Sequence, residues 1–220
     1  MKIKFKTPAK INLGLHIHGK REDGFHELET IFQMVSLYDD LELELLPSGI
    51  KLECNAPGVP TDENNLVYKA VLLLRKNYQV EDKGVSIRLK KNIPFGAGLG
   101  GGSGNAAGVL MGLNRLWNLN IEREKLATLA AELGSDVPFF LTSPCALGIG
   151  RGEKLEALKT CPKFQVLLVF PGFPIATSWV YQNLKLKLTK RVNNISILRK
   201  NLSLFDIKSL GSQLYNDLEP

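Results

Sequence analysis

Apolar and polar residues alternate in five short stretches of this chain, as they do in β-strands. The stretches cover residues 2–6, 11–17, 41–45, 50–54 and 85–89, and side chains two positions apart share one face of a strand. Several of them follow one another without a helical pattern between them, which favours an antiparallel or mixed sheet. Helical spacing appears at residues 64–76, 105–117 and 122–133, with Gly134 as a stop signal for the last. The chain is therefore predicted to contain both a sheet and helices.

A second unit is predicted after residue 155. Residues 166–170 form a continuous apolar run, which predicts a buried strand. Leu210, Leu214 and Leu218 repeat every four residues, which predicts a last helix over 210–218 with an apolar stripe. We therefore expect two domains, residues 1–155 and 156–220, and further chain to cover that stripe.

Glycine is concentrated in one loop, where six of the chain's 20 glycines fall between positions 96 and 104. Glycine suits positions that need positive φ or a close approach of the backbone. The loop follows a strand pattern and precedes an apolar helical stripe, so it leads into a helix N-terminus. Free N–H groups and the helix dipole make such an N-terminus a phosphate site. A flexible linker is a poor alternative, because an amphipathic helix follows directly.

Three known phosphate loops compete for this segment. A Walker loop requires Gly-Lys-Ser/Thr, and residues 102–104 contain no lysine. Gly96, Gly98 and Gly101 satisfy the dinucleotide pattern, but the acidic residue expected about 20 positions later is matched only loosely by Glu122. Residues 94–103, PFGAGLGGGS, strongly resemble the second motif of the GHMP kinases, a family named for galactokinase, homoserine kinase, mevalonate kinase and phosphomevalonate kinase.

The composition changes this picture little. The chain has 220 residues, 44% of them apolar, and no apolar run long enough to span a membrane. Cys54, Cys145 and Cys161 are odd in number and lack Cys-x-x-Cys spacing, which suits free thiols in a reducing cytosol. The net charge is +6, and much of the excess lies between Lys185 and Lys208 without interleaved aromatics. We expect a solvated face there, with neither a nucleic acid nor a membrane as partner.

The segment 8–15, PAKINLGL, carries a second candidate site. Ile11, Leu13 and Leu15 alternate, so Lys10 and Asn12 share the opposite face of the strand. A lysine and an amide side by side suit an anionic or hydroxylated ligand, although an ordinary exposed strand face gives the same pattern. The segment resembles the first motif of the same kinase family.

Asp136 is the third candidate, in the segment 134–140, GSDVPFF. From the residues alone, an aspartate between two helical stretches is a helix cap. The segment also resembles the one that carries the family's catalytic aspartate. By that resemblance Asp136 is the base that takes the proton of a substrate hydroxyl, and Lys10 is its cationic neighbour.

Residues 23–28, DGFHEL, resemble the cytidine-recognising segment of one branch of the family, which acts in the non-mevalonate route to isoprenoid precursors. The resemblance implies that Phe25 stacks on a cytosine and that His26 reads its edge. That branch commonly has tyrosine at the position of Phe25. Tyr181 falls where the branch places a second stacking aromatic, although a helix-core aromatic explains it equally well. His16 and His18 lack a third ligand nearby in sequence, so we expect them to be structural.

Asn65 lies in a run of residues that cap helices, residues 62–65. The same run resembles the family's stretch near the adenine, so Asn65 is either an N-cap or a donor to the base.

The resemblance covers residues 8 to about 217 and implies a two-domain α+β GHMP kinase fold, with an N-terminal domain like ribosomal protein S5 domain 2 and a ferredoxin-like C-terminal domain that looks truncated. It implies ATP-dependent phosphorylation of an alcohol on a small cytidine diphosphate compound, with Mg²⁺ met by Ser103. The implied ATP contacts are Asn65, Lys91, Pro94, Phe95, Gly96, Ala97, Gly98, Leu99, Gly100, Gly101, Gly102, Ser103 and Gly104; the implied substrate contacts are Asn12, Phe25, His26 and Tyr181.

The chain departs from the pattern of the kinase family at two points. Gly104 stands where a second serine is common, and no third glycine-rich motif is present. The alternatives are therefore a catalytically weak nucleotide-binding module, a sister kinase with another alcohol substrate and, last, a dinucleotide oxidoreductase.

Overall fold

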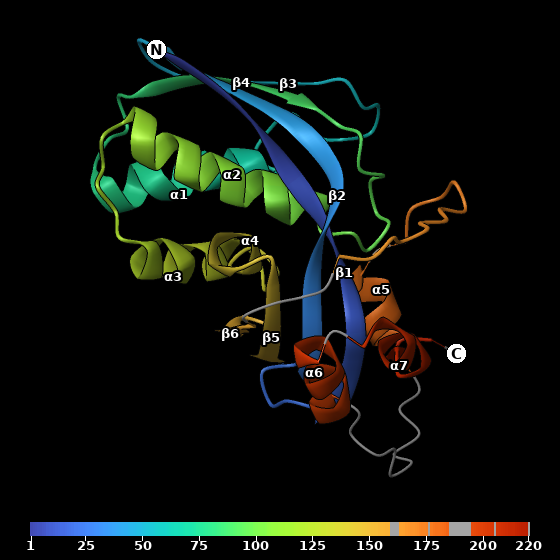
Figure 1. Cartoon of the computed structure of the whole chain (residues 1–220). Coiled ribbons are helices and arrows are strands. Elements are labelled where there is room, and N and C mark those ends of the chain that lie inside the picture. Colours follow the sequence, from blue (N-terminus) through green and yellow to red (C-terminus); the bar gives the residue numbers. More distant parts are fainter. Residues whose placement is uncertain (159–162, 176, 185–194, 205, 220) are drawn as a thin grey trace. The chain divides into compact units, whose positions relative to one another are not determined.

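The computed structural model describes residues 1–158, 163–175, 177–184, 195–204 and 206–219. They form two compact units that are interleaved along the chain. Unit 1 consists of residues 1–9, 36–95 and 99–141; unit 2 consists of residues 10–35, 96–98 and 142–220. Two long strands, β1 (Lys2–Lys20) and β2 (His26–Leu46), run through both units (Figure 1). The predicted division at residue 155 stays a prediction.

Unit 1 contains a mixed sheet, as the sequence predicts. Its strand order is β3-β4-β2-β1, where β3 spans Ile50–Cys54 and β4 spans Gly84–Lys90. β4 pairs antiparallel with β2 and parallel with β3, so Ile87 is opposite Leu43 on one side and Leu52 on the other. All three side chains are buried, which makes this row of the sheet part of the core.

Helices α1 (Leu66–Tyr78), α2 (Gly101–Leu116), α3 (Arg123–Leu133) and α4 (Phe139–Thr142) complete unit 1. Helix α2 begins four residues earlier than predicted, because the glycines that look like loop in the sequence form its first turn. Gly104, Gly108 and Gly112 lie one turn apart and face the sheet. A Cβ on Gly108 would lie 2.7 Å from Thr7 and one on Gly112 would lie 2.4 Å from Leu43. This glycine stripe lets α2 pack directly against β1 and β2.

Unit 2 has the strand order β6-β5-β2-β1-β7, with β5 at Cys145–Gly150, β6 at Lys154–Ala157 and β7 at Tyr215–Asn216. Its helices are α5 (Thr177–Gln182), α6 (Ile195–Ser203) and α7 (Ile207–Ser212). The core is a cluster of buried residues from strands and helices, namely Leu13, Ile31, Cys145, Ile195, Leu198, Leu202 and Leu210. Helix α6 contacts β1 closely, since a Cβ on Gly14 would lie 2.5 Å from Leu198.

Two predictions in unit 2 are wrong. No helix or strand forms at residues 166–170, where Leu167 and Val169 are more than 80% exposed. The predicted helix 210–218 ends at Ser212, and residues 215–216 instead pair in parallel with Gly14 and Leu15 of β1. Leu210 is buried and Leu214 exposed, so the expected stripe does not exist. Lys185, Lys187, Lys190 and Arg191, part of the predicted basic face, lie outside the described residues.

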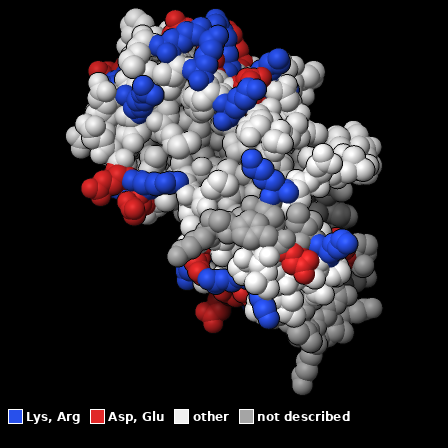
Figure 2. Space-filling model, in the orientation of Figure 1, with Lys and Arg blue, Asp and Glu red and all other residues white. Residues whose placement is uncertain are grey.

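Charged side chains of both signs gather on unit 1 where β1 begins (Figure 2). Lys2 and Lys4 pair with Glu42 at 2.6 and 2.8 Å, and Arg88 pairs with Glu42 at 2.9 Å. Hydrogen bonds from Lys2 and Lys4, with a further one from Arg88, lower the pKa of Glu42 to about 2. These cations are matched by carboxylates, as on a solvated face. Within the described part of the chain, no helix is long and apolar enough to cross a bilayer.

Candidate functional site

The glycine loop has the backbone geometry that its composition predicts. Gly96, Gly98 and Gly100 have φ values of +69°, +71° and +66°, a conformation that residues with a Cβ rarely adopt. Gly100 is the N-cap of α2, and no side-chain hydrogen bond caps this helix. The first-turn N–H groups are therefore available to an anion, with the positive end of the helix dipole behind them.

Gly104 has a packing role that the sequence does not reveal. A Cβ at this position would lie 2.9 Å from the carbonyl oxygen of Pro8 and 3.3 Å from the ring of Phe140. A serine here would have to displace backbone. The glycine therefore fits the close contact between α2 and β1 in this chain.

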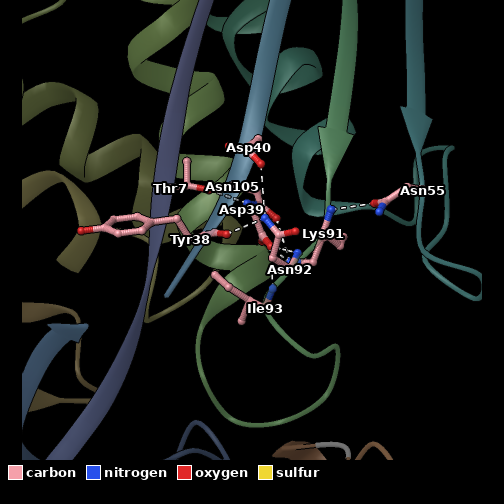
Figure 3. Close-up of polar contacts among 9 residues, drawn as sticks. All are labelled: Thr7, Tyr38, Asp39, Asp40, Asn55, Lys91, Asn92, Ile93 and Asn105. Atoms are coloured by element: carbon pink, nitrogen blue, oxygen red, sulfur yellow. Dashed lines mark hydrogen bonds and ion pairs between the residues drawn. The ribbon is translucent and has the colours of Figure 1, made fainter. Parts of the chain in front are cut away.

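Lys91 lies in the interior next to the loop (Figure 3). Its ammonium pairs with Asp39 and donates to Oδ1 of Asn105 at 3.2 Å, and its side chain is only 7% exposed. Direct contact of Lys91 with ATP stays a prediction. Sequence reasoning missed Asp39, although a signal was present: Asp39 shares its strand face with Leu41 and Leu43, and a carboxylate on an apolar face needs buried partners.

Lys10, Asn12 and Thr30 form a chain of hydrogen bonds in unit 2. Nζ of Lys10 donates to Oδ1 of Asn12 at 2.8 Å, and Nδ2 of Asn12 donates to the Thr30 hydroxyl at 2.7 Å. That hydroxyl donates to the Gly14 carbonyl at 2.7 Å. Lys10 is buried, and its ammonium also lies 5.4 Å from the ring centroid of Phe32. The two predicted residues thus share a face, and Thr30, which sequence reasoning missed, fixes their orientation.

Asp136 lies in the turn between α3 and α4, as its sequence context predicts. Helix α3 ends at Leu133, and the N–H of Val137 donates to the Gly134 carbonyl at 3.1 Å. The Asp136 side chain is half-buried. A tight turn of this kind holds a carboxylate in a fixed direction, which suits either a cap or a base.

Phe25 is the last residue of the exposed turn between β1 and β2. The residue is 51% exposed, and the guanidinium of Arg151 lies 4.7 Å from the centroid of its ring. Arg21 forms ion pairs with Glu27 and Asp23. Both raise the pKa of Arg21, and the hydrogen bond to Glu27 has the larger effect. No sequence pattern predicts the contact with Arg151, which directly follows β5 and lies near the turn because β5 pairs with β2.

His26 and Tyr181 are brought together from positions 155 residues apart. Their ring centroids are 5.2 Å apart and the rings are inclined by 29°, so they stack. The structure thus places Tyr181 of α5 beside the segment that carries Phe25 and His26. A role for any of the three in substrate binding stays a prediction.

Asn65 is the N-cap of α1. Its Oδ1 accepts the Val67 N–H at 2.9 Å and its Nδ2 donates to the Pro60 carbonyl at 2.6 Å. The capping interpretation is confirmed, and donation to adenine stays a prediction. His16 and His18 contact Asp217 at 2.8 Å and Glu29 at 3.5 Å. Among the described residues, no group of three His, Cys, Asp or Glu side chains is arranged to hold a metal ion.

An uncapped helix N-terminus behind a loop of positive-φ glycines, on an α+β scaffold, is suited to binding the phosphates of a nucleotide. The model of the GHMP kinase N-terminal domain matches residues 65–143, the part of the chain that contains the loop, α2 and Asp136. This match agrees with the family that the sequence motifs resemble.

Known relatives narrow the class. A 4-diphosphocytidyl-2-C-methyl-D-erythritol kinase from Chlorobium phaeobacteroides (strain BS1) is 44% identical over 99% of this chain and 76% of its own length. One from Bacillus cytotoxicus is 48% identical over 84% of this chain and 64% of its own length. A crystal structure of 4-(cytidine 5'-diphospho)-2C-methyl-D-erythritol kinase matches with a TM-score of 0.76 and 34% identity, over 99% of this chain and 76% of that one. The chain belongs to the 4-diphosphocytidyl-2-C-methyl-D-erythritol kinase family.

Proposed function

We propose that this protein is an ATP-dependent kinase that phosphorylates the 2-hydroxyl of 4-diphosphocytidyl-2-C-methyl-D-erythritol, a step of the non-mevalonate isoprenoid pathway. The observation that carries the proposal is the glycine loop at the uncapped N-terminus of α2, in a chain 44% identical to a relative of that name. The expected place of action, the cytosol, stays a prediction.

The loop supplies the ATP site in this proposal. Backbone N–H groups of the first turn of α2 bind phosphate oxygens. Gly98 and Gly102 are exposed, and because glycine has no side chain, a phosphate can approach the backbone at both positions. Ser103 in the same turn carries a half-buried hydroxyl. One hydroxyl fits a Mg²⁺ ion that is held mainly by the nucleotide's own phosphate oxygens. When bound there, Mg²⁺ neutralises phosphate charge.

Asp136 and Lys10 perform the proton chemistry in this proposal. The Asp136 carboxylate takes the proton of the substrate's 2-hydroxyl. The hydroxyl oxygen attacks the γ-phosphorus of ATP, and ADP leaves. The Lys10 ammonium favours the ionised base and the developing alkoxide. Its bond to Asn12, which Thr30 holds in place, orients the ammonium before the substrate arrives.

Phe25, His26 and Tyr181 form the cytidine site in this proposal. The His26–Tyr181 stack already places two flat rings together. A cytosine can stack against aromatic rings here, and the imidazole offers a hydrogen bond to the base edge.

Replacing Asp136 tests the proposal. Asp136→Asn keeps the side-chain shape and removes the base, so turnover should fall on the order of 10²-fold or more while the KM for ATP changes little. ADP release is measured with the cytidine compound and with a panel of other alcohols. Glu132→Gln makes the same charge change at an exposed position of α3 and should leave turnover unchanged.

ADP release, together with calorimetric binding of a non-hydrolysable ATP analogue, separates the alternatives. Near-normal turnover of Asp136→Asn would reduce Asp136 to a capping residue. ATP binding without turnover in the unaltered chain would favour the nucleotide-binding module, and preference for another alcohol would favour a sister kinase.

A further inference from the structure

One fully buried carboxylate in unit 1 receives four hydrogen-bond donors from the two sides of the glycine loop (Figure 3). Oδ1 of Asp39 accepts the backbone N–H groups of Asn92 and Ile93 at 2.7 and 2.8 Å. Oδ2 accepts the ammonium of Lys91 and, at 3.0 Å, Nδ2 of Asn105. The Asp39 side chain is 0% exposed, so this arrangement is part of the interior.

These donors mark the entry and the exit of the loop. Asn92 and Ile93 come directly before Pro94, and Asn105 lies in α2 just past its first turn. Lys91 also links the two ends of the loop directly, because its ammonium donates a hydrogen bond to Asn105. Its ammonium also lies against Gly101, where an added Cβ would be 2.9 Å from Nζ.

The far side of the cluster is anchored to the sheet. Nδ2 of Asn105 also donates to the hydroxyl of Thr7 on β1 at 2.7 Å, and Asp39 itself is part of β2. A hydrogen-bonded charge in a dry interior has few alternative arrangements, because any other would leave a buried polar group without a partner. The cluster therefore sets the distance between the two ends of the loop.

We propose that Asp39 is a positioning residue for ATP: it ties the entry of the phosphate loop to the start of α2 and so pre-orders the N–H groups that bind phosphate. This inference rests on the proposed function. Pre-ordered donors bind more tightly because less conformational freedom is lost when the ligand arrives.

The test compares Asp39→Asn with Asp40→Asn, the same change one residue along β2. In D39N an NH₂ group replaces one of the two carboxylate oxygens. In either orientation of the amide this NH₂ opposes donors, namely the Lys91 ammonium and the Asn105 NH₂ on one side or the backbone N–H groups of Asn92 and Ile93 on the other. Asp40 accepts only from the Asn92 side chain in the described contacts, at 3.3 Å, which makes D40N a matched control. Binding of a non-hydrolysable ATP analogue is measured by calorimetry, and exchange of the amide protons of residues 92–104 by mass spectrometry, well below the melting temperature of each variant.

D39N should weaken analogue binding about tenfold or more and speed exchange in the loop by a similar factor, while the KM for the alcohol substrate stays the same and D40N behaves like the unaltered chain. A D39N variant that melts lower but binds the analogue and exchanges as before would overturn the proposal, because Asp39 would then serve only the fold. If D39N does not fold, Asn105→Ala carries the test, since it keeps the Asp39–Lys91 pair and removes the hydrogen bonds that join α2 to Asp39, Lys91 and Thr7. It should change binding and exchange in the same direction, and unchanged values would overturn the proposal.

Failure of the proposed function looks different. If the unaltered chain does not bind the ATP analogue, the kinase assignment fails. Loop exchange in D39N still decides whether Asp39 orders the loop.

Discussion

Asp39 in unit 1 and Asp23 in unit 2 make similar bonds in opposite surroundings. Asp39 accepts two backbone N–H groups and pairs with Lys91, and Asp23 accepts one backbone N–H group and pairs with Arg21. The Asp39 side chain is 0% exposed, whereas that of Asp23 is 45% exposed. In the proposed function, the first holds a loop that binds phosphate through backbone N–H groups, and the second holds a turn that presents the side chain of Phe25 to the cytosine.

The two regions should therefore differ in how well they tolerate substitutions. A site made of backbone donors has no side chain that can readjust, so its accuracy depends on buried supports. A site made of exposed rings can move and still stack on a base. Surface ion pairs also contribute little, because water and salt screen them. We therefore expect steep effects at the phosphate loop and shallow ones at the turn.

Gly100→Val should give the largest effect of the predictions that follow. Gly100 has a φ of +66°, where a β-branched residue is strained by about 1–2 kcal/mol or more. The strain falls at the N-cap of α2, so the first-turn N–H groups should lose their common direction. ATP-analogue affinity, measured by calorimetry, should fall on the order of 10²-fold.

Gly49→Val, in the turn between β2 and β3, is the control for this change. Gly49 has a φ of +78°, and an added Cβ there meets nothing within 4 Å. The substitution brings the same backbone strain outside the glycine loop, so it should lower the melting temperature and leave ATP-analogue affinity unchanged. If Gly100→Val binds the analogue normally, backbone geometry at the loop is not what makes the site.

Replacing Phe25 and His26 together by alanine should give a moderate, one-sided effect. Loss of stacking and of the imidazole should raise the KM for the cytidine substrate on the order of tenfold and leave the KM for ATP alone. Steady-state kinetics with each substrate varied in turn measures both. Trp179→Ala, at an exposed position of the same helix as Tyr181, is the control. An equal rise for both substrates would mean general damage and would remove the distinction between the two regions.

The glycine loop was predictable from sequence because its backbone conformation depends on glycines. Alternating glycines such as Gly96, Gly98 and Gly100 predict positive φ values, and the apolar stripe that follows predicts the helix. The share of the fold that was predicted has the same origin: residues 41–45, 50–54 and 85–89 show clean alternation and belong to strands.

The supports of the site were not predictable by the same means. The first half of β2 escaped notice because both of its faces are covered, so that Thr30, Ile31 and Phe32 are all buried and no alternation remains. The interior bonds of Asp39, the Arg151–Phe25 contact and the His26–Tyr181 stack join residues distant in sequence. The same limit explains the wrong helix at 210–218: an i, i+4 repeat gives a helical pattern, but pairing of residues 215–216 with β1 overrides it.

Asp23→Asn should give the smallest effect and is the surface counterpart of D39N. Partial desolvation raises the pKa of Asp23, but the hydrogen bond from the Phe25 N–H and the bond from Arg21 outweigh it and leave the pKa below its ordinary 3.8. A carboxyl with a lowered pKa stabilises the turn above pH 3.8, and that contribution is lost as the pH falls through the lower value of the folded state. The Phe25 amide resonance, followed by NMR from pH 6 to pH 2.5, should therefore shift with a midpoint below 3.8, and D23N should abolish the shift.

At pH 7.5 the amide oxygen of the asparagine in D23N still accepts the Phe25 N–H, so the KM for the cytidine substrate should change less than about twofold. Added salt should make even that difference smaller. If the KM for the cytidine substrate rises in D23N by as large a factor as ATP-analogue affinity falls in D39N, burial does not explain the difference between the two aspartates.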